Sequence, residues 1–175
     1  MILYPEEWSK KEYETDVLII GSGIAGTSVA IELQKKNIKT IVVEGGKESY
    51  TEESQNCYEG SSSGINLPYG LKGSRLRFHG GSSNCWAGMC GELEEEDFQD
   101  RDWVSNSGWP IKKKDLVPFY KRASDFLAIN RNSIDNPNFI HGMKKFNGLE
   151  TRSLVQTKIH FFKNEFKSNF EKNNN

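Results

Sequence analysis

The residue pattern that points most directly to chemistry is a set of three glycines followed by an acid. Gly21, Gly23 and Gly26 form the pattern G-x-G-x-x-G, and Glu44 follows about 20 residues later. The first two glycines allow a tight turn and close approach to a pyrophosphate, and the third lets a helix pack on a strand. An acid at this distance accepts hydrogen bonds from ribose hydroxyls. The predicted dinucleotide contacts are Gly21, Ser22, Gly23, Ile24, Ala25, Gly26, Glu44 and Gly45.

Two strands and a helix must hold these residues in place. Residues 16–20, "DVLII", and 40–44, "TIVVE", are short apolar runs, while Ala25, Val29 and Leu33 fall on one helical face. This order predicts a βαβ unit and an α/β fold of the Rossmann type. The acid suits NAD and FAD equally well and would repel the extra phosphate of NADP, so the fingerprint leaves NAD and FAD open.

A second stretch, residues 77–88, reads "RFHGGSSNCWAG" and joins two glycines to small polar groups and a tryptophan. Gly, Ser and Asn are common turn residues. A turn does not require a large aromatic side chain such as that of Trp86, however. We therefore expect a loop whose main chain lies along a flat ligand.

The segments "VVEGG", "RFHGGSSNCWAG" and "SGWPIKKKDLVPFYKRASDFLAI" resemble, in this order, the N-terminal half of the glucose-methanol-choline family of flavin oxidoreductases. The similarity is greatest to its pyranose-oxidase-like and bacterial sugar-dehydrogenase-like branch, and it spans about residues 16–129. It implies an FAD-dependent enzyme that oxidises the CH–OH group of a sugar, polyol or other alcohol, with hydride passing to flavin N5. It also implies flavin contacts from Arg77, Gly80, Gly81, Ser82, Ser83, Asn84, Cys85 and Trp86.

The resemblance implies a role for each part of this tract. The glycine pair allows the main chain to touch the isoalloxazine ring, residues 82–84 present donors near its polar edge, and Trp86 packs beside the ring or shapes the pocket. Arg77 balances phosphate or reduced-flavin charge, or it is simply an exposed arginine.

Cys85 departs from the branch that the chain resembles. Relatives with a covalently attached flavin have histidine at this position, so a histidyl link here is excluded. A cysteinyl link is one alternative, and a small buried thiol packed against the dimethylbenzene edge is the other. We expect the buried thiol and noncovalent FAD.

Three parts of the chain differ in composition. Residues 1–15 are predicted to be an N-terminal extension and residues 16–129 the FAD-binding region. Residues 130–175 combine a polar connection, "NRNSIDNPNF", a strand within residues 149–162 and an amphipathic helix over residues 163–175. A further helix is predicted from Asp115 as N-cap, with Pro118 in its first turn. Its expected core-facing stripe is Leu116, Phe119, Ala123, Phe126 and Leu127.

Charge and composition exclude several classes of partner. The net charge of -1, with acids and bases interspersed, offers no footprint for nucleic acid, and "VLII" is too short for a membrane span. The start of the chain lacks the pattern of a signal peptide, so we expect a cytoplasmic protein. Three cysteines without a CxxC pair indicate reduced thiols, and no residue spacing predicts a metal site.

No catalytic residue is predicted within this chain. No residue in the sequence stands at a spacing from His79 that is typical of a catalytic pair, so His79 is interpreted as a hydrogen-bonded bystander. His141 and His160 lie outside every motif. The resemblance implies that the catalytic histidine and most of the substrate-binding sheet lie in a C-terminal part that this chain lacks. We therefore expect the FAD-binding portion of an oxidoreductase. A noncatalytic flavin-binding fragment of a truncated or split gene and an NAD-binding module are the alternatives.

Overall fold

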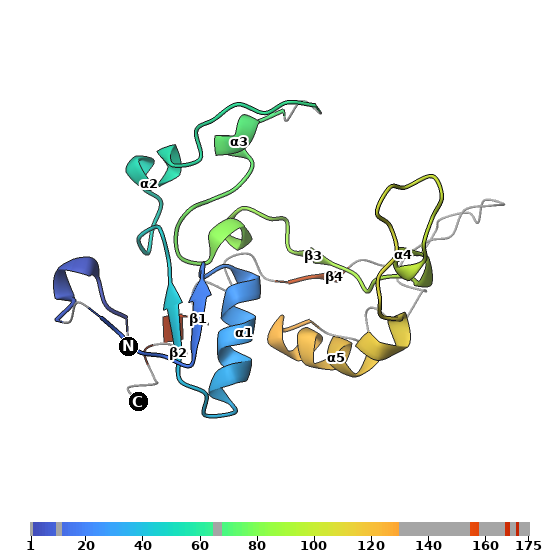
Figure 1. Cartoon of the computed structure of the whole chain (residues 1–175), viewed down its shortest axis with the longest axis horizontal. Coiled ribbons are helices and arrows are strands. Elements are labelled where there is room, and N and C mark those ends of the chain that lie inside the picture. Colours follow the sequence, from blue (N-terminus) through green and yellow to red (C-terminus); the bar gives the residue numbers. More distant parts are fainter. Residues whose placement is uncertain are drawn as a thin grey trace. The chain divides into compact units, whose positions relative to one another are not determined.

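The computed structural model of the chain describes residues 2–9, 12–64, 68–129, 155–157, 167–168 and 171. Two compact units are present, one formed by Met1–Trp86 with Ile159–Asn175 and the other by Ala87–Lys158 (Figure 1). The elements of the first unit are η1 (Pro5–Glu7), β1 (Val17–Ile20), α1 (Ile24–Gln34), β2 (Thr40–Val43), α2 (Glu52–Asn56), α3 (Gly70–Gly73) and η2 (Gly81–Asn84). Those of the second are β3 (Met89–Cys90), α4 (Glu95–Phe98), α5 (Lys113–Phe126) and β4 (Val155–Gln156).

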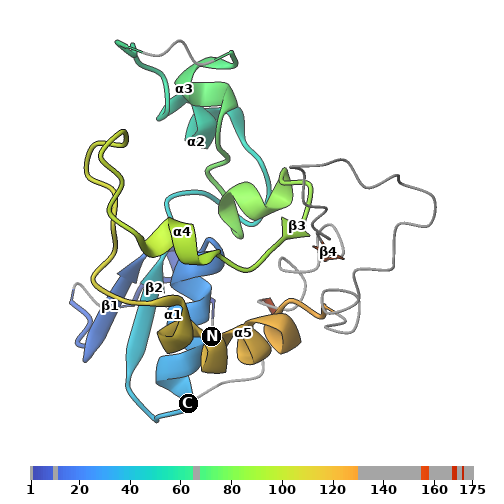
Figure 2. The ribbon, with the colours of Figure 1, turned by 90° about the vertical axis from the view of Figure 1, so that its right-hand side faces the viewer.

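The first unit is built on the predicted βαβ motif, which is confirmed. Strands β1 and β2 pair in parallel, with Val17 opposite Thr40 and Ile20 opposite Val43. A parallel pair needs a crossover connection, and α1 provides it. The helix lies beside both strands in the two views (Figures 1 and 2). The motif places the end of β1 and the start of α1 next to the end of β2.

The close packing of α1 depends on Gly26, as the glycine pattern predicts. A Cβ at this position would lie 2.1 Å from the carbonyl oxygen of Gly21, so no larger residue fits without moving the turn. The buried positions of the helix are Thr27 and Ala30. The face that carries Ala25, Val29 and Leu33 is not the buried one, because Ala25 is exposed, Val29 is 51% exposed and Leu33 is only half-buried. The helix is apolar around most of its circumference, so the closest contact with the sheet selects the buried face, and Gly26 makes that contact.

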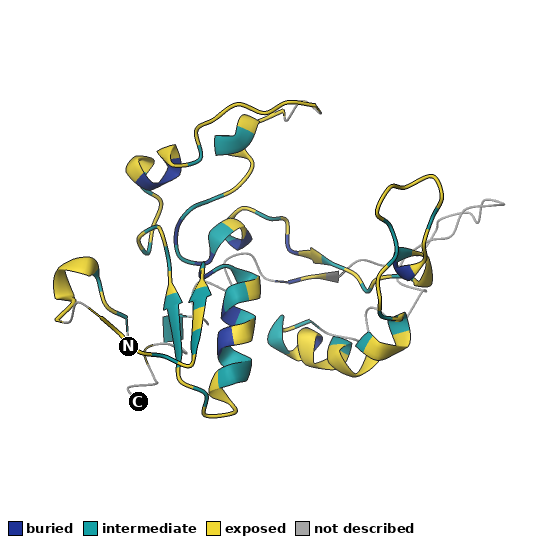
Figure 3. Ribbon diagram, in the orientation of Figure 1, coloured by how far each residue is buried: buried dark blue, intermediate teal, exposed yellow. Residues whose placement is uncertain are grey.

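Strand β1 leaves much of its apolar surface exposed. Leu18 is 57% exposed and Ile20 is 85% exposed, and the exposed colour is visible on both strands in Figure 3. Within the described residues, β1 and β2 form a sheet of two strands only. Each strand therefore has one edge of unpaired backbone groups in that part of the chain.

Helices α2 and α3 lie together at one side of the first unit (Figure 2). Thr51 caps α2 by accepting a hydrogen bond from the N–H of Ser54, 3.2 Å away. On α3, the Lys72 ammonium donates to the Glu52 carboxylate and to the side-chain oxygen of Asn56. These contacts hold α2 and α3 together ahead of the glycine pair Gly80 and Gly81.

In the second unit, β3 and β4 form a short antiparallel ladder with Met89 opposite Gln156. The strand predicted within residues 149–162 is thus confirmed at Val155–Gln156. Helix α4 buries Phe98, whose ring makes an edge contact with Trp109 at 6.1 Å between centroids. Among the described residues of this unit Phe98 is the buried hydrophobic residue, whereas Trp109 is 57% exposed.

Helix α5 begins earlier than predicted. Its N-cap is Lys112, and Asp115 occupies the third helical position, where its carboxylate accepts the Lys112 N–H at 2.9 Å. Pro118 accordingly lies inside the helix and not in its first turn. Aspartate is favoured both at the N-cap and in the first turn of a helix. Asp115 alone therefore does not show whether the helix begins at Asp115 or three residues earlier.

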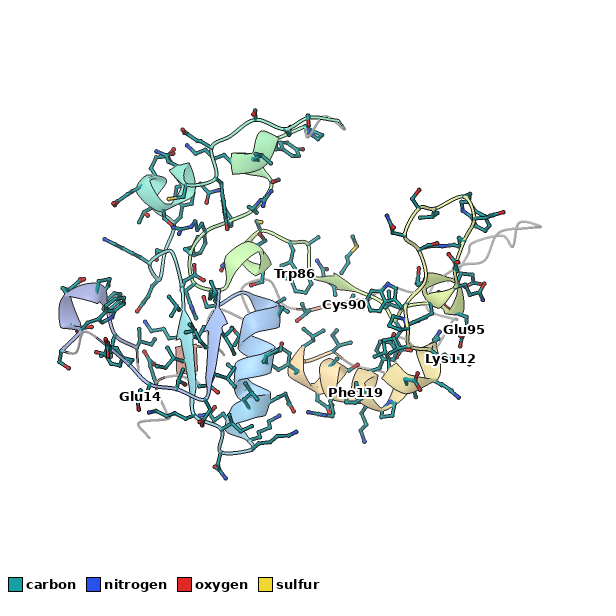
Figure 4. The ribbon with its side chains drawn as sticks, in the orientation of Figure 1. Glu14, Trp86, Cys90, Glu95, Lys112 and Phe119 are labelled. Atoms are coloured by element: carbon teal, nitrogen blue, oxygen red, sulfur yellow. The ribbon has the colours of Figure 1, made fainter. Side chains whose placement is uncertain are left out.

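The predicted stripe of α5 is only partly covered. Leu116, Phe126 and Leu127 are half-buried, whereas Ala123 is exposed and Phe119 is 54% exposed. Figure 4 shows Phe119 on the helix and Lys112 at its start. The buried residue of this helix is Ser124, whose hydroxyl donates to the carbonyl of Tyr120.

The remaining predictions fall largely outside the described residues. The polar connection at residues 130–139 lies there entirely, as does most of the predicted helix at 163–175, although Lys167, Ser168 and Glu171 are helical. Across the described residues, no helix has the length and apolar character needed to cross a membrane.

Candidate cofactor site

The turn between β1 and α1 forms the centre of the candidate site. Gly21 has a φ of +98°, which favours glycine, and its N–H donates to the Val43 carbonyl at 2.7 Å. Gly23 is the N-cap of α1, and no side chain among the described residues caps this helix. A Cβ added at Gly21 or at Gly23 would meet no atom of the described part of the chain within 4 Å. The helix N-terminus therefore faces open space, and such a terminus attracts anions.

Glu44 lies directly after β2 and reaches the same turn. One of its oxygens, Oε2, accepts hydrogen bonds from the backbone N–H and the hydroxyl of Ser22, both at 2.8 Å. The other, Oε1, accepts the N–H of Gly46 at 3.0 Å. Partial burial raises the pKa of this carboxyl, but the Ser22, Gly46 and Gly45 donors outweigh it and hold the pKa below its ordinary value of 4.5. Glu44 is thus an ionised acceptor at neutral pH.

The structure brings the two glycine motifs together. Gly23 and Gly80 form an isolated parallel bridge, and a Cβ at Gly81 would lie 3.4 Å from the Cα of Gly23. Both Gly80 and Gly81 have positive φ angles, +87° and +55°, so the chain turns there as glycine allows. Residues 21–26 and 77–86 consequently form one continuous site.

The small polar residues after the glycine pair make internal contacts that shape the loop. Ser83 is buried and its hydroxyl donates to the Gly80 carbonyl at 2.6 Å. The Asn84 amide donates to the carbonyls of His79 and Gly81, and the Ser82 hydroxyl accepts the N–H of Leu76. In the structure these side chains hold the 3-10 turn η2 in its conformation.

Cys85 is exposed on the loop, and the packing of its thiol against the dimethylbenzene edge of the flavin stays a prediction. The residue ends η2, and its Sγ donates back to the carbonyl of Ser82 at 3.3 Å. This local contact turns the side chain to the surface of the loop. Trp86 follows and is half-buried; its indole is labelled in Figure 4.

Arg77 lies beside the end of β2. Its Nη1 donates to the Gly45 carbonyl at 2.5 Å and to the Ser54 hydroxyl at 3.1 Å. A Cβ at Gly45 would be 2.3 Å from Nη2, so the guanidinium is packed directly against that glycine. The structure thus packs the Arg77 guanidinium against Gly45, the residue that follows Glu44.

Sequence reasoning missed Gln55, which is 3% exposed in α2. Its amide nitrogen donates to the carbonyls of Lys72 and Arg75, and its oxygen accepts the N–H of Arg77. Three hydrogen bonds from one side chain fix the segment that leads into the glycine tract. A capping threonine and an acidic first turn at residues 51–53 are the sequence signal from which this helix could have been predicted, but nothing local indicates what its glutamine contacts.

These residues fit a dinucleotide. The uncapped start of α1 and the bare glycines suit a pyrophosphate, and the ionised Glu44 carboxylate suits ribose hydroxyls. The first-turn residues Ile24 and Ala25 carry no charge that would repel a phosphate. The site therefore has the donor and acceptor types that such a ligand requires.

Comparison with known proteins identifies this ligand more closely. No curated protein and no solved structure matches the chain at the significance required. A family described as FAD dependent oxidoreductase matches residues 16–128, which include every residue of the candidate site. The cofactor is FAD, and the βαβ motif belongs to a Rossmann-like FAD-binding fold. Because the match covers well over half of its length, the chain belongs to the FAD dependent oxidoreductase family.

Proposed function

We propose that FAD binds noncovalently along the joined glycine motifs. The pyrophosphate lies at the start of α1, and the adenosine ribose donates its hydroxyls to Glu44. The isoalloxazine ring follows residues 80–86. The observation that supports this arrangement is the bridge between Gly23 and Gly80, because residues 21–26 and residues 77–86 lie side by side there.

We further propose that the parent activity is that of the glucose-methanol-choline type, with a sugar, polyol or other alcohol as the CH–OH donor. The order of the segments "RFHGGSSNCWAG" and "SGWPIKKKDLVPFY" supports this assignment. When bound, FAD supplies the ring that accepts hydride. The residues of this chain bind and orient that ring, while the shape of η2 keeps the main chain of Gly80 and Gly81 beside it.

The proposed role of this chain is cofactor binding without the catalytic base. Of the three histidines in the sequence, His79 lies among the described residues, and its Nδ1 contacts the Ser22 hydroxyl at 3.2 Å. That contact, together with the burial of Nε2, supports a role in the loop and not in proton abstraction. We thus propose that the chain is the FAD-binding portion of an active oxidoreductase. The alternative is a flavin-binding protein without catalytic activity.

Glycine substitutions test the proposed pyrophosphate site. Gly23 has a φ of −67°, which any residue adopts, and a methyl group there would enter open space. Gly23→Ala should therefore fold with only a small loss of stability, of about 1 kcal/mol for a poorer N-cap, yet lose FAD binding. Gly26→Ala is the contrast, since its methyl would overlap the Gly21 carbonyl and should destabilise the fold itself.

The measurement is titration of the purified chain with FAD and, separately, with NAD, followed by flavin absorbance and nicotinamide fluorescence. We expect FAD binding in the wild type, its loss in Gly23→Ala, and an unchanged circular dichroism spectrum. Full FAD affinity in Gly23→Ala would contradict the placement of the pyrophosphate. Binding of NAD in preference to FAD would contradict the proposed function as a whole.

A further inference from the structure

The hydroxyl of Ser22 makes three polar contacts with residues distant in the sequence. It lies 2.8 Å from Glu44 Oε2, 3.2 Å from His79 Nδ1 and 3.4 Å from the backbone nitrogen of Gly80. Ser22 itself is 3% exposed, so water does not compete freely for these contacts. One hydroxyl thus joins the acid that follows β2 to the second glycine tract.

The directions of these hydrogen bonds follow from the number of protons available. A serine hydroxyl has one proton and two acceptor lone pairs. Glu44 is ionised and only accepts, so the Ser22 proton points to Oε2. The Ser22 oxygen is then left to accept from its two other neighbours. The Gly80 nitrogen is a donor in any case, and His79 Nδ1 must therefore carry a proton.

We propose that Ser22 is a positioning residue that couples Glu44 to the glycine-serine tract and holds neutral His79 in its Nδ1–H tautomer. The tautomer of a histidine is set by the hydrogen bonds of its ring nitrogens. In this arrangement Nε2 keeps its lone pair and serves as the acceptor of the ring. His79 is fixed from its main chain as well, because its N–H donates to the Lys47 carbonyl at 2.9 Å.

The coupling has a consequence for the cofactor, which rests on the proposed function. Glu44 is the proposed ribose ligand, and Gly80 begins the proposed flavin-side loop. The Ser22 hydroxyl keeps these two parts in register while contacting neither ribose nor flavin in the proposed arrangement. Loss of the hydroxyl should therefore weaken FAD binding by about tenfold, the scale of one hydrogen bond to a charged group.

Nitrogen NMR of the full chain tests the tautomer directly. The protein is labelled with ¹⁵N-histidine, and the His79 signals are assigned by their absence from His79→Gln. Spectra are recorded about two pH units above the ordinary histidine pKa of about 6.5, where an imidazole of ordinary pKa is neutral. We expect Nδ1 to carry the proton in the wild type, whereas unconstrained neutral histidine favours Nε2–H.

Three variants separate positioning from general damage. Ser22→Ala should shift His79 toward the Nε2–H form and weaken FAD binding, and Ser22→Thr, which keeps a hydroxyl, should restore the Nδ1–H form. Ser28→Ala is the matched control, because the Ser28 hydroxyl donates only within α1, to the Ile24 carbonyl. It should change neither the tautomer nor the FAD affinity.

The outcomes are distinguishable. His79 in the Nε2–H form in the wild type would overturn the proposal, and this measurement stands even if Ser22→Ala fails to fold. An unchanged tautomer in a folded Ser22→Ala would also overturn it. A chain with the Nδ1–H form that binds no FAD would instead refute the proposed function and leave the hydrogen-bond network in place.

Discussion

At the scale of single residues, the charge of Glu44 is the property most open to test. Because its pKa is lowered in the folded chain, the ionised carboxylate stabilises the fold above pH 4.5, its ordinary pKa. That contribution is lost as pH falls through the depressed pKa, when the protonated acid gives up its Ser22 and Gly46 donors. Acidification below pH 4.5 should consequently weaken both folding and FAD binding.

Glu44→Gln and Glu44→Ala isolate this effect from the other carboxylates. Both variants should lack the part of the acid-dependent loss that Glu44 causes. Glu44→Ala should also reduce FAD affinity at neutral pH by about 1 to 3 kcal/mol, the cost of losing hydrogen bonds to a charged acceptor. FAD titrations at several pH values provide the measurement. Glu53→Ala, an exposed acid in α2, is the control. Equal affinity in Glu44→Ala and Glu53→Ala would remove Glu44 from the site.

Cys85 provides a second prediction at this scale. Position 85 holds a cysteine and not the histidine that would attach a flavin under the proposed resemblance, and the thiol is exposed and directed to the Ser82 carbonyl. FAD should therefore leave the protein on acid or heat denaturation, and the precipitated chain should be colourless. Cys85→Ser should bind FAD as the wild type does. A flavin-sized mass added to the peptide that contains Cys85 would show a covalent link and disprove the prediction.

At the scale of elements, α2 is expected to support the cofactor site through Gln55. Gln55→Ala removes three hydrogen bonds and leaves the Lys72 and Arg75 carbonyls without the amide donor. The free energy of unfolding should fall by about 1 to 3 kcal/mol, and FAD affinity should fall with it because the segment before Arg77 loosens. Denaturant unfolding measures the first quantity and FAD titration the second.

The control for this prediction is Gln34→Ala, which removes the same side chain from an exposed position at the end of α1. It should leave both quantities within about 0.5 kcal/mol of the wild type. A similar result for Gln55→Ala would mean that α2 contributes little to the site.

The elements also show which features local sequence determines. The βαβ motif was predictable because the apolar runs and glycine spacing of residues 16–44 act over short distances. The buried face of α1 was not predictable, because a helix that is apolar around most of its circumference shows no distinct apolar stripe. The close contact of Gly26 with the Gly21 carbonyl determines which face is buried. The start of α5 was misplaced because Asp115 suits two helical positions. The contacts of Ser22 with His79 join residues far apart in the chain, and no local pattern encodes them.

At the scale of the whole molecule, the described residues bury little apolar surface. Among them, the buried hydrophobic residues are Ala30, Phe78 and Phe98, whereas β1 exposes Leu18 and Ile20. Exposed apolar strands with open edges favour association with other surfaces. We expect the isolated chain to bind a hydrophobic dye and to associate at high concentration, and addition of FAD should reduce both.

The same chain should not oxidise alcohols by itself. In the structure the Nδ1 of His79 contacts Ser22 and its Nε2 is buried, so no base is proposed among the residues that bind FAD. Without a base, the roughly 10² to 10⁴-fold contribution of proton transfer is missing, and the flavin alone gives no measurable turnover. The test supplies the homogeneous, FAD-loaded chain with a panel of sugars and polyols and a dye acceptor. His79→Gln, compared in parallel, should match the wild-type background. Clear turnover by the wild type that disappears in His79→Gln would show that His79 is the base and that the chain is an oxidoreductase in its own right.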